Sequence, residues 1–498
     1  MAKLTPAVSP VSENGFEIEE ATIADLQSAM EHKKITAQDL TDSYLNRIEQ
    51  FDDQLNAFIS INPNAKATAA QRDQERVKGN LRGPLHGIPL IVKDNINTAD
   101  LPTTSGCCAL ATLQPAQDAF VVARLRDAGA IILGKANLHE LACSGETVSS
   151  LGGQTHNPYN LAYTPGGSSG GSAVAIAANL VTAGLGTDAV NSVRSPASAC
   201  NIVGLRPTPG LVSRAGLMSV SFSQDVIGPM GRTVADVATL LEAIAVDDAN
   251  DPMTARSAMH AIGSYQPALK QNGLQGMRLG IVRSLFGQSA VHQEVNSNMD
   301  AAFNTMERLG AQCREIAVKI DIDLMMEELS LPLWEGKLHF NHYLKTLSKA
   351  APVKNLKALI KSGKVHTSIQ PMLKKMQAID SPLGYGEYWQ RLYPRRSELR
   401  QHLTHIFQRY QLDALVYPHQ RQLVAPIGEP QQERNGFLAA ASGFPAITIP
   451  GGFSTTGIPI GIELMATPFQ ESHLLQMAYA YEQETLWRQK PDPLKVLA

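Results

Sequence analysis

The chain has 498 residues, of which 44% are hydrophobic and 18% are charged, and its 43 basic and 46 acidic side chains give a net charge of −3. This composition is typical of a globular protein with a large apolar core, and without a basic block it gives nucleic acid binding no electrostatic support. Five scattered cysteines without CxxC spacing indicate neither a disulfide framework nor a zinc site.

The N-terminal residues 1–15 are rich in proline, serine and small residues, which predicts a loose arm. They contain no apolar core of a signal peptide, and no run in the chain approaches the ~18 apolar residues that are needed to span a bilayer. We therefore expect a cytoplasmic protein that does not contact a membrane.

From Ile18 to about Arg76 the spacing of apolar residues predicts helices, with one helix start at Thr36–Asp39. The run HGIPLIVKDNI (86–96) predicts a buried strand, and residues 119–138 predict a helix, a turn and a second strand, which together are typical of an α/β unit. The Ala-rich run 172–186 predicts a buried helix. Further strands are expected in MRLGIVRSL (277–285), LDALVYP (412–418) and AAASGFPAITIPGGF (439–453).

Residues 321–411 have a different character. They contain long amphipathic helical stretches with lysine, methionine, several tyrosines, Trp334 and Trp389. No internal repeat or low-complexity linker separates them from the rest of the chain. We therefore predict one large α/β domain over residues 16–490, with 321–411 as a variable and mostly helical segment within it.

The stretch TPGGSSGGSAV (164–174) places two serines between two pairs of glycines. A linker does not fit because an apolar helix follows at once, and a Walker phosphate loop would need a lysine after Gly171. The nucleophile-elbow pattern G-x-S-x-G matches twice, but a polar loop precedes it where an elbow needs an apolar strand. The remaining interpretation is a serine site whose base is not histidine.

Lys93 is a candidate for that base. It ends the apolar run 88–92, and burial lowers the pKa of an ammonium group from ~10.4. The alternative is a lysine at a strand end whose amine reaches solvent. Spacing alone does not choose between the two.

Several long stretches carry a resemblance to a known family. They are GPLHGIPLIVKDNI (83–96), TPGGSSGGSAVAIAANL (164–180), GTDAVNSVRSPASACNIVGLRPT (186–208) and SGFPAITIPGGF (442–453). They resemble the amidase signature family, and the wording of residues 210–230 is most similar to its peptide-amidase-like branch. The resemblance implies a single α/β/α domain with a central mixed β-sheet flanked by helices, and it implies no cofactor and no metal.

The resemblance also implies a catalytic set. The lysine of the family falls on Lys93, the serine on a cis peptide bond falls on Ser168, and the nucleophile falls on Ser192. Ser169 is then a neighbour that supports the network. A neutral Lys93 would accept a proton from Ser168, which takes one from Ser192 as that residue attacks an amide carbonyl.

The loop before the nucleophile departs from the family. The family reads TDTGGS where this chain reads TDAVNS (187–192). We expect the backbone N–H groups of this loop to form an oxyanion hole, from the residues Ala189, Val190, Asn191 and Ser192. We expect Asp188 and Arg194, which flank the loop, to form a structural ion pair rather than to act directly in catalysis.

Three further features stay open at this level. Cys143 corresponds to a region that lines the family's acyl pocket, and it fits either a substrate wall or core packing. The resemblance implies that segment 321–411 covers the site. Glu335, His339 and His342 have the helical spacing of a metal site, but a polar helix face is the preferred interpretation because the family needs no metal.

The sequence therefore predicts an amidase that converts a carboxylic amide, or a related C–N compound, to an acid and ammonia or an amine. The expected partner is a small-molecule amide or a peptide amide, with a homodimer as an open possibility. Two alternatives remain: the glutaminase subunit of a tRNA amidotransferase complex, and a non-catalytic binding descendant. Retention of Lys93, Ser168 and Ser192 together argues against the second.

Overall fold

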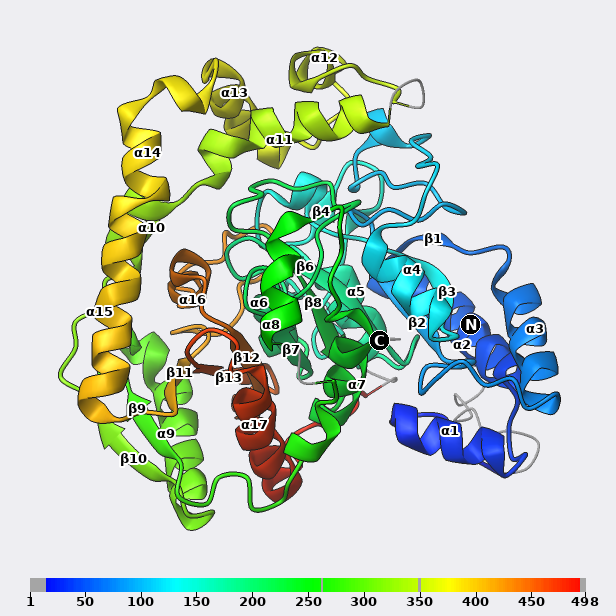
Figure 1. Cartoon of the computed structure of the whole chain (residues 1–498), viewed down its shortest axis with the longest axis horizontal. Coiled ribbons are helices and arrows are strands. Elements are labelled where there is room, and N and C mark those ends of the chain that lie inside the picture. The colour runs from blue at the N-terminus through cyan, green and yellow to red at the C-terminus, as the bar shows by residue number, and fades with distance from the viewer. Residues whose placement is uncertain (1–14, 261–262, 348–350, 493–498) are drawn as a thin grey trace, which may run out of the picture.

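The structure is a computed structural model that describes residues 15–260, 263–347 and 351–492 (Figure 1). The arm that the sequence predicts at residues 1–15 lies outside these ranges, apart from Gly15. Within the described ranges, no helix is both long enough and apolar enough to cross a membrane.

A mixed sheet of 11 strands forms the centre of the molecule, in the order β1-β3-β2-β6-β8-β7-β12-β13-β11-β9-β10. β2 pairs in parallel with β3 and β6, whereas β8 runs antiparallel to β6 and β7. The strands are β1 (Phe58–Ile61), β2 (Pro89–Lys93), β3 (Ile131–Ala136), β6 (Ala183–Asp188), β7 (Val203–Arg206), β8 (Val226–Gly231), β9 (Arg278–Ile281), β10 (Gln312–Glu315), β11 (Ala414–Pro418), β12 (Ala446–Phe453) and β13 (Pro459–Met465), with β4 (Val148–Ser149) and β5 (Gly153–Gln154) forming a separate pair.

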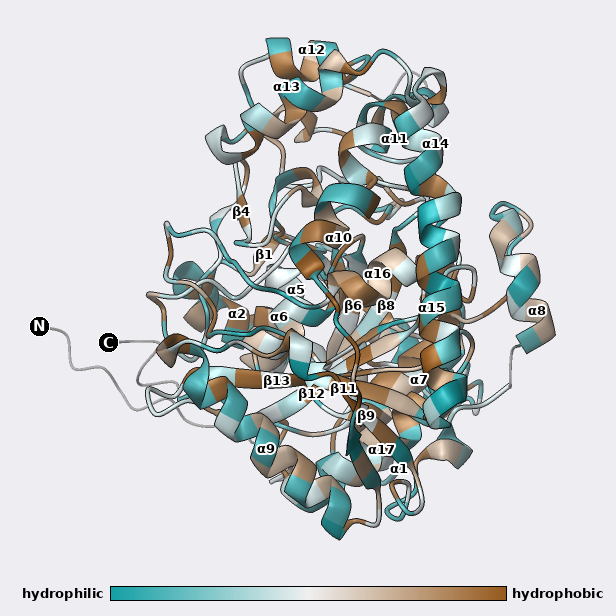
Figure 2. Ribbon diagram, turned by 90° about the vertical axis from the view of Figure 1, so that its left-hand side faces the viewer, coloured by the Kyte–Doolittle hydropathy of each residue, from teal (hydrophilic) through white to brown (hydrophobic). Residues whose placement is uncertain are grey.

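Helices flank the sheet, as the resemblance implied. α5 and α7 pack against β6 and β8, and α9 and α17 pack against β12 and β13. In Figure 2 the strands are mostly hydrophobic and the outer helices α9 and α15 carry hydrophilic faces. The helices outside segment 321–411 are α1 (Ile23–Glu31), α2 (Ala37–Leu55), α3 (Ala65–Val77), α4 (Phe120–Asp127), α5 (Gly170–Ala177), α6 (Arg194–Ala199), α7 (Val234–Ile244), α8 (Ser257–His260), α9 (Gln293–Arg308), α16 (Phe437–Ser442) and α17 (Glu471–Thr485).

The expected helix start at Thr36–Asp39 is confirmed. Thr36 is the N-cap of α2, its hydroxyl accepts from the Asp39 N–H, and the Asp39 carboxylate accepts from the Thr36 N–H. This reciprocal pair satisfies two donors that a helix start leaves unpaired. The strands expected within 86–96, 119–138, 277–285, 412–418 and 439–453 are also present, as β2, β3, β9, β11 and β12.

Two strands lie where the sequence predicted only helix. β1 interrupts the region 18–76, and its residues pair with β3 at the edge of the sheet. The Ala-rich run 172–186 divides into the end of α5 and most of β6, because Asn179 takes a left-handed conformation with φ of 56° that ends the helix. β6 leads directly into the loop before Ser192, so this correction bears on the site.

Segment 321–411 is mostly helical in its described residues and lies along one side and the top of the molecule in Figure 1. Its α11, α12 and α13 share a small apolar core with loops from outside the segment, including Cys107, Leu141 and Met218. We call the part of the chain outside segment 321–411 the central domain. The helices of the segment are α10 (Ile322–Leu329), α11 (Pro332–Thr346), α12 (Leu356–Lys361), α13 (Gln370–Ala378), α14 (Gly386–Leu392) and α15 (Pro394–Tyr410).

Candidate active site

Lys93 ends β2, an interior strand of the sheet, and is 0% exposed. Its Nζ lies 2.7 Å from the hydroxyl oxygen of Ser168 and 2.9 Å from that of Thr187. The alternative of a strand-end lysine that reaches solvent is therefore wrong. The β2 backbone, paired on both sides, fixes the point from which the side chain reaches these two hydroxyls.

The surroundings of Lys93 favour the neutral amine. Burial lowers its pKa from 10.5 to about 7, although the negative charges of Asp225 and Asp188 act in the opposite direction. Removing a charged group from water disfavours the charged form, and here that cost exceeds the attraction of the two carboxylates. Near neutral pH Lys93 can therefore hold or release a proton.

The glycine- and serine-rich loop presents Ser168 to Lys93. The peptide bond between Gly167 and Ser168 is cis, and Gly166 has φ of 72°, which side chains resist. A Cβ on Gly171 would lie 2.3 Å from the Asn137 carbonyl oxygen, so only glycine lets the two backbones approach. The His139 N–H donates to the Ser168 carbonyl oxygen at 3.0 Å, which anchors the loop to the core.

Ser169 ties this loop to the strand and loop that lead to Ser192. Its hydroxyl donates to the Thr187 carbonyl oxygen and accepts from the Thr187 N–H, both at 3.2 Å. Its own N–H donates to the Ser192 carbonyl oxygen at 3.1 Å. The two serines of the GSSG turn thus differ: Ser168 faces the lysine and Ser169 holds the backbone.

Ser192 lies between β6 and α6 and is 8% exposed. Within the described chain its hydroxyl has no hydrogen bond, whereas the hydroxyls of Ser168 and Ser169 are both bonded to protein groups. Of the three serines, Ser192 is therefore the one whose hydroxyl is left for a bound molecule.

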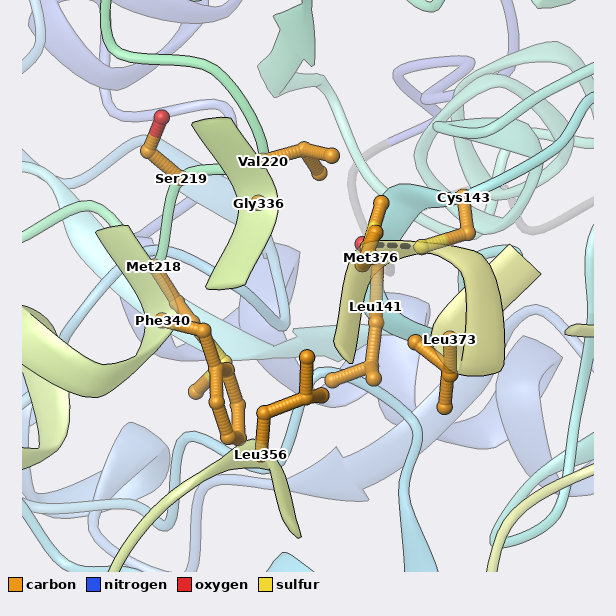
Figure 3. Close-up of a pocket in the computed structure, with 10 residues that line it drawn as sticks. All are labelled: Leu141, Cys143, Met218, Ser219, Val220, Gly336, Phe340, Leu356, Leu373 and Met376. Carbon is orange, nitrogen blue, oxygen red and sulfur yellow. Dashed lines mark hydrogen bonds between the residues drawn. The ribbon is translucent and has the colours of Figure 1, made fainter. Parts of the chain in front are cut away.

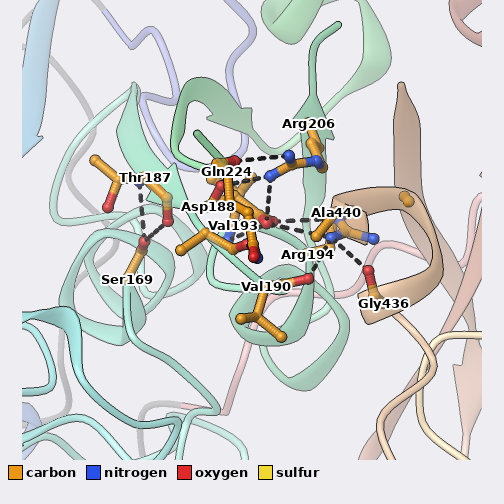
Figure 4. Close-up of polar contacts among 12 residues, drawn as sticks. Ser169, Thr187, Asp188, Val190, Val193, Arg194, Arg206, Gln224, Gly436 and Ala440 are labelled. Atoms are coloured by element: carbon orange, nitrogen blue, oxygen red, sulfur yellow. Dashed lines mark hydrogen bonds and ion pairs between the residues drawn. The ribbon is translucent and has the colours of Figure 1, made fainter. Parts of the chain in front are cut away.

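The loop before Ser192 is held by its carbonyl oxygens. Arg206 donates to the carbonyl of Asp188, and Arg194 donates to the carbonyl of Val190 at 2.8 Å. The side chain of Gln224 donates to the carbonyl of Ala189 at 2.9 Å. Figure 4 shows these side chains gathered around Asp188. Among the described residues, the N–H groups of residues 189–192 donate to no protein acceptor.

Asp188 and Arg194 form the ion pair that the sequence predicted, at 3.1 Å, and it is part of a larger buried network. Arg206 also pairs with Asp188 at 2.9 Å, and Arg194 reaches Glu463 at 2.5 Å. Burial would raise the pKa of Asp188, but the two guanidinium groups outweigh it and hold that pKa below its usual value. Two carboxylates thus balance two guanidinium groups without net charge.

Four members of this network were not predicted from the sequence: Arg206, Gln224, Glu463 and His419. His419 is fully buried and bonds to Glu463, and burial keeps its pKa below the usual value, so it stays neutral. Arg206 stands within a motif of the family resemblance, at the end of a strand, and a charged residue in so apolar a run was the available signal.

Cys143 lines a small, partly open apolar pocket with a cavity volume of about 20 Å³ (Figure 3). Leu141, Met218 and Val220 contribute from loops of the central domain, and the remaining walls come mostly from segment 321–411. The Met218 carbonyl accepts from the Asn95 side chain at 3.4 Å, and the same amide nitrogen donates to the Thr187 hydroxyl beside Lys93 at 3.1 Å. The full lining is Leu141, Cys143, Met218, Ser219, Val220, Gly336, Phe340, Leu356, Leu373 and Met376.

Glu335 does not belong to an exposed polar helix face, because it is 0% exposed and its carboxylate contacts other protein groups. The buried Glu335 carboxylate accepts from the hydroxyls of Ser221 and Ser223, both at 2.6 Å, and from the Tyr388 hydroxyl at 2.9 Å. Its acceptors are thus used to hold the loop 218–225 against α11. In the described ranges no cluster of three or more His, Cys, Asp or Glu side chains is arranged to bind a metal ion.

Known proteins resemble this chain over nearly its whole length. The model of the family described as Amidase matches residues 39–475. A probable amidase of Arabidopsis thaliana is 36% identical over 497 residues, which cover 96% of this chain and 92% of the relative. The solved structure of the peptide amidase PAM in complex with the competitive inhibitor chymostatin is 38% identical, with a TM-score of 0.88, and the match covers 96% of this chain and 100% of that one. A glutamyl-tRNA(Gln) amidotransferase subunit of Synechococcus sp. (strain CC9605) is 32% identical over 476 residues, which cover 93% of this chain and 96% of that protein.

Proposed function

The chain belongs to the amidase family and is a hydrolase of amide C–N bonds, and on this premise we propose that it acts through an acyl-enzyme on Ser192. The observation that carries the proposal is the contact of 2.7 Å between the buried Lys93 and Ser168, beside a serine whose hydroxyl is unbonded within the described chain. A base, a relay and a free nucleophile are the parts that such a reaction needs.

The proton path begins at neutral Lys93. Lys93 takes the proton of Ser168, Ser168 takes the proton of Ser192, and the Ser192 oxygen attacks the amide carbonyl. The same path returns the proton to the leaving nitrogen as the C–N bond breaks and ammonia or an amine departs. Water, deprotonated in the same way, then attacks the acyl ester, releases the acid and restores Ser192. The Ser192 hydroxyl is free to turn toward Ser168 or toward a substrate.

The N–H groups of Ala189, Val190, Asn191 and Ser192 form the oxyanion hole. They stand directly before and at the nucleophile, and they lack protein acceptors within the described chain. Donors fixed in advance stabilise the negative oxygen of the tetrahedral intermediate without having to reorganise. Asp188 and Arg194 are positioning residues, because Arg194 pairs with Asp188 and donates to the Val190 carbonyl of this loop.

The substrate places an apolar group in the pocket around Cys143. The pocket is lined mainly by aliphatic, aromatic and sulfur-containing side chains. One lining residue, Met218, is connected through its carbonyl to the Asn95–Thr187–Lys93 chain of hydrogen bonds. An apolar acyl side chain, such as that of the terminal residue of a peptide amide, gains about 25 cal/mol per Å² on entering it. Segment 321–411 supplies half of the lining residues and thus contributes to substrate choice.

A second candidate is the glutaminase subunit of an amidotransferase, because the Synechococcus amidotransferase subunit matches 93% of this chain. This alternative predicts slow hydrolysis without a partner protein. The apolar pocket argues against it, since the side chain of free glutamine ends in the polar amide that is to be cleaved.

The test is turnover of a panel of amides by the purified chain. We expect peptide amides with an apolar terminal residue to be cleaved, and Ser192→Ala to abolish the reaction while leaving the circular dichroism spectrum unchanged. Lys93→Ala and Ser168→Ala are expected to lose at least ~10²-fold in kcat, as removal of general-base function does. Full activity in Ser192→Ala would refute the acyl-enzyme.

A further inference from the structure

Gln224 joins two parts of the molecule through one side chain. It is 1% exposed, and it lies in the loop 218–225 between α11 and the sheet. Its Nε2 donates to the Ala189 carbonyl at 2.9 Å, and its Oε1 accepts from the Leu331 N–H at 2.8 Å. Because one neighbour is an acceptor and the other a donor, only one orientation of the amide satisfies both. Leu331 is the N-cap of α11, the first helix of the pocket wall.

The bond to Ala189 fixes the direction of an N–H group. In a trans peptide the carbonyl and the following N–H point in opposite directions. When the Ala189 carbonyl faces Gln224, the Val190 N–H therefore faces away from it. Arg206 on the Asp188 carbonyl and Arg194 on the Val190 carbonyl act in the same way on the two neighbouring peptides. In each of these three peptides, the carbonyl is occupied by a side chain and the N–H is directed away from that side chain.

Gln224 differs from the two arginines in what holds it. Arg194 and Arg206 are fixed by their ion pairs with Asp188, inside the central domain. Gln224 is fixed by the start of α11, and α11 carries the pocket residues Gly336 and Phe340. The loop of Gln224 also lines the pocket, through residues 218–220. One amide thus lies between the pocket wall and the peptide before Val190.

We propose that Gln224 is a positioning residue that aims the Val190 N–H at the substrate carbonyl and makes this aim depend on α11. The inference rests on the proposed acyl-enzyme mechanism. When the apolar group of a substrate packs against α11, the start of that helix stays in place. Gln224 then keeps its position against the loop 189–192, which supplies the oxyanion hole. Loss of the amide leaves substrate binding in place and weakens the stabilisation of the oxyanion, so it lowers kcat more than it changes KM.

The experiment compares three variants of the full-length protein. Gln224→Leu removes both hydrogen bonds at similar volume. Gln224→Glu keeps an acceptor for the Leu331 N–H but faces the Ala189 carbonyl with a second oxygen. The matched control is Tyr343→Phe, which removes another buried hydrogen bond between α11 and the central domain, the 2.6 Å bond to Asn97, and leaves Ala189 untouched. The readouts are kcat, KM, the rate of covalent labelling by a fluorophosphonate, and the melting temperature.

We expect Gln224→Leu and Gln224→Glu to lose about 10- to 100-fold in kcat with KM changed less than about 3-fold, which is somewhat less than the loss of a whole oxyanion donor. Labelling should slow in parallel, because the phosphonyl oxygen occupies the same hole. Tyr343→Phe should keep kcat within about 2-fold, because it removes no interaction that is made only in the transition state.

The inference is overturned if both Gln224 variants keep wild-type kcat, if the loss lies in KM alone, or if Tyr343→Phe loses as much kcat as they do at an equal fall in melting temperature. Should Gln224→Leu not fold, Gln224→Glu decides by the same criteria. If the wild type is labelled and hydrolyses amides while the Gln224 variants are unaffected, this inference is wrong and the proposed mechanism stands. A wild type that neither labels nor hydrolyses any amide overturns the proposed mechanism and this inference with it.

Discussion

Whether Lys93 can act as a base depends on a competition between burial and charge at a single nitrogen. Full burial lowers its pKa to about 7, while Asp225 and Asp188 favour the protonated form. The contact partners are hydroxyls rather than carboxylates, so no direct ion pair holds the proton on the amine. The site therefore keeps a lysine neutral at a pH where an exposed lysine is almost fully charged.

This balance predicts the pH dependence of the reaction. The working form of Lys93 is the neutral one, and its pKa in the folded protein is lowered, so activity is lost as pH falls through about 7 and is fully present above it. We expect kcat/KM to rise between about pH 6 and about pH 8, one unit on either side of that pKa, and then to level off. A profile that is flat over this range, or one that rises only near the ordinary lysine pKa, would contradict the role of Lys93.

Val190 and Asn191 replace two glycines of the family, and the structure separates their effects. Neither has a positive φ, so both use ordinary backbone angles. The Asn191 side chain is nearly buried beside Gly436, where an added Cβ would come within 2.8 Å of the Asn191 Cβ. Val190 is half-buried and packs on the core. The restriction on substrates that the two side chains predict thus rests mainly on Val190.

We expect Val190→Gly to widen the substrate range. Its kcat/KM for bulky amides, relative to a small aliphatic amide, should rise about 10-fold, the scale on which a few methyl groups discriminate in a pocket. Asn191→Gly is the comparison and should change the ratio little. If Asn191→Gly widens the substrate range and Val190→Gly does not, the steric restriction arises from Asn191 and not from Val190. If neither single variant nor the pair changes the ratio, the loop does not limit substrate size.

At the scale of elements, the pocket arises where segment 321–411 meets the loops of the central domain. Gly336 on α11 is a point of close approach, since a Cβ there would lie 2.7 Å from the Met376 sulfur on α13. The glycine lets two helices of the segment pack closely while both line the pocket. Volume added at this position must displace the Met376 side chain, which itself lines the pocket, or enter the pocket directly.

Gly336→Val is therefore expected to lower kcat/KM for amides with a large apolar group by at least about 10-fold more than for a small aliphatic amide. Gly384→Val is the matched control, because that glycine lies in the same segment and has nothing within 4 Å of an added Cβ. Equal effects of the two variants on both substrates would show that the apolar group binds elsewhere.

Elements that carry their own signal were predictable from the sequence. β2 is a continuous apolar run, and α2 begins with a complete capping box. β1 and β6 were missed because their residues continue a helical or Ala-rich pattern, and only pairing with distant strands makes them extended. The positions of Lys93, Ser168 and Ser192 came from motifs. Arg206 and Gln224 lie within stretches that resemble the family, but only the fold shows their contacts with Asp188 and Ala189, which are 18 and 35 residues away. Glu463 lies 269 residues from Arg194, so no local pattern connects the two.

At the scale of the whole molecule, the site depends on the order of strands in one sheet. β2 supplies Lys93, and β6 leads to Ser192. β8 separates β6 from β7, and β7 ends at Arg206. β13 brings Glu463 to the same network from near the C-terminus. One chain thus supplies every group that the proposed mechanism uses. This assembly predicts that the chain purified alone is active, and that a chelator such as EDTA leaves its rate unchanged.

The central claim is that Ser192 is the nucleophile and that Lys93 and Ser168 activate it. The most direct measurement is mass spectrometry of the chain, purified alone and treated with a fluorophosphonate, with Ser168→Ala and Lys93→Ala beside the wild type. The mechanism predicts a single adduct on Ser192 in the wild type and adduct formation slowed at least ~10²-fold in both variants. An adduct on Ser168 or Ser169, or equally rapid labelling of Ser192 in the two variants, would contradict it.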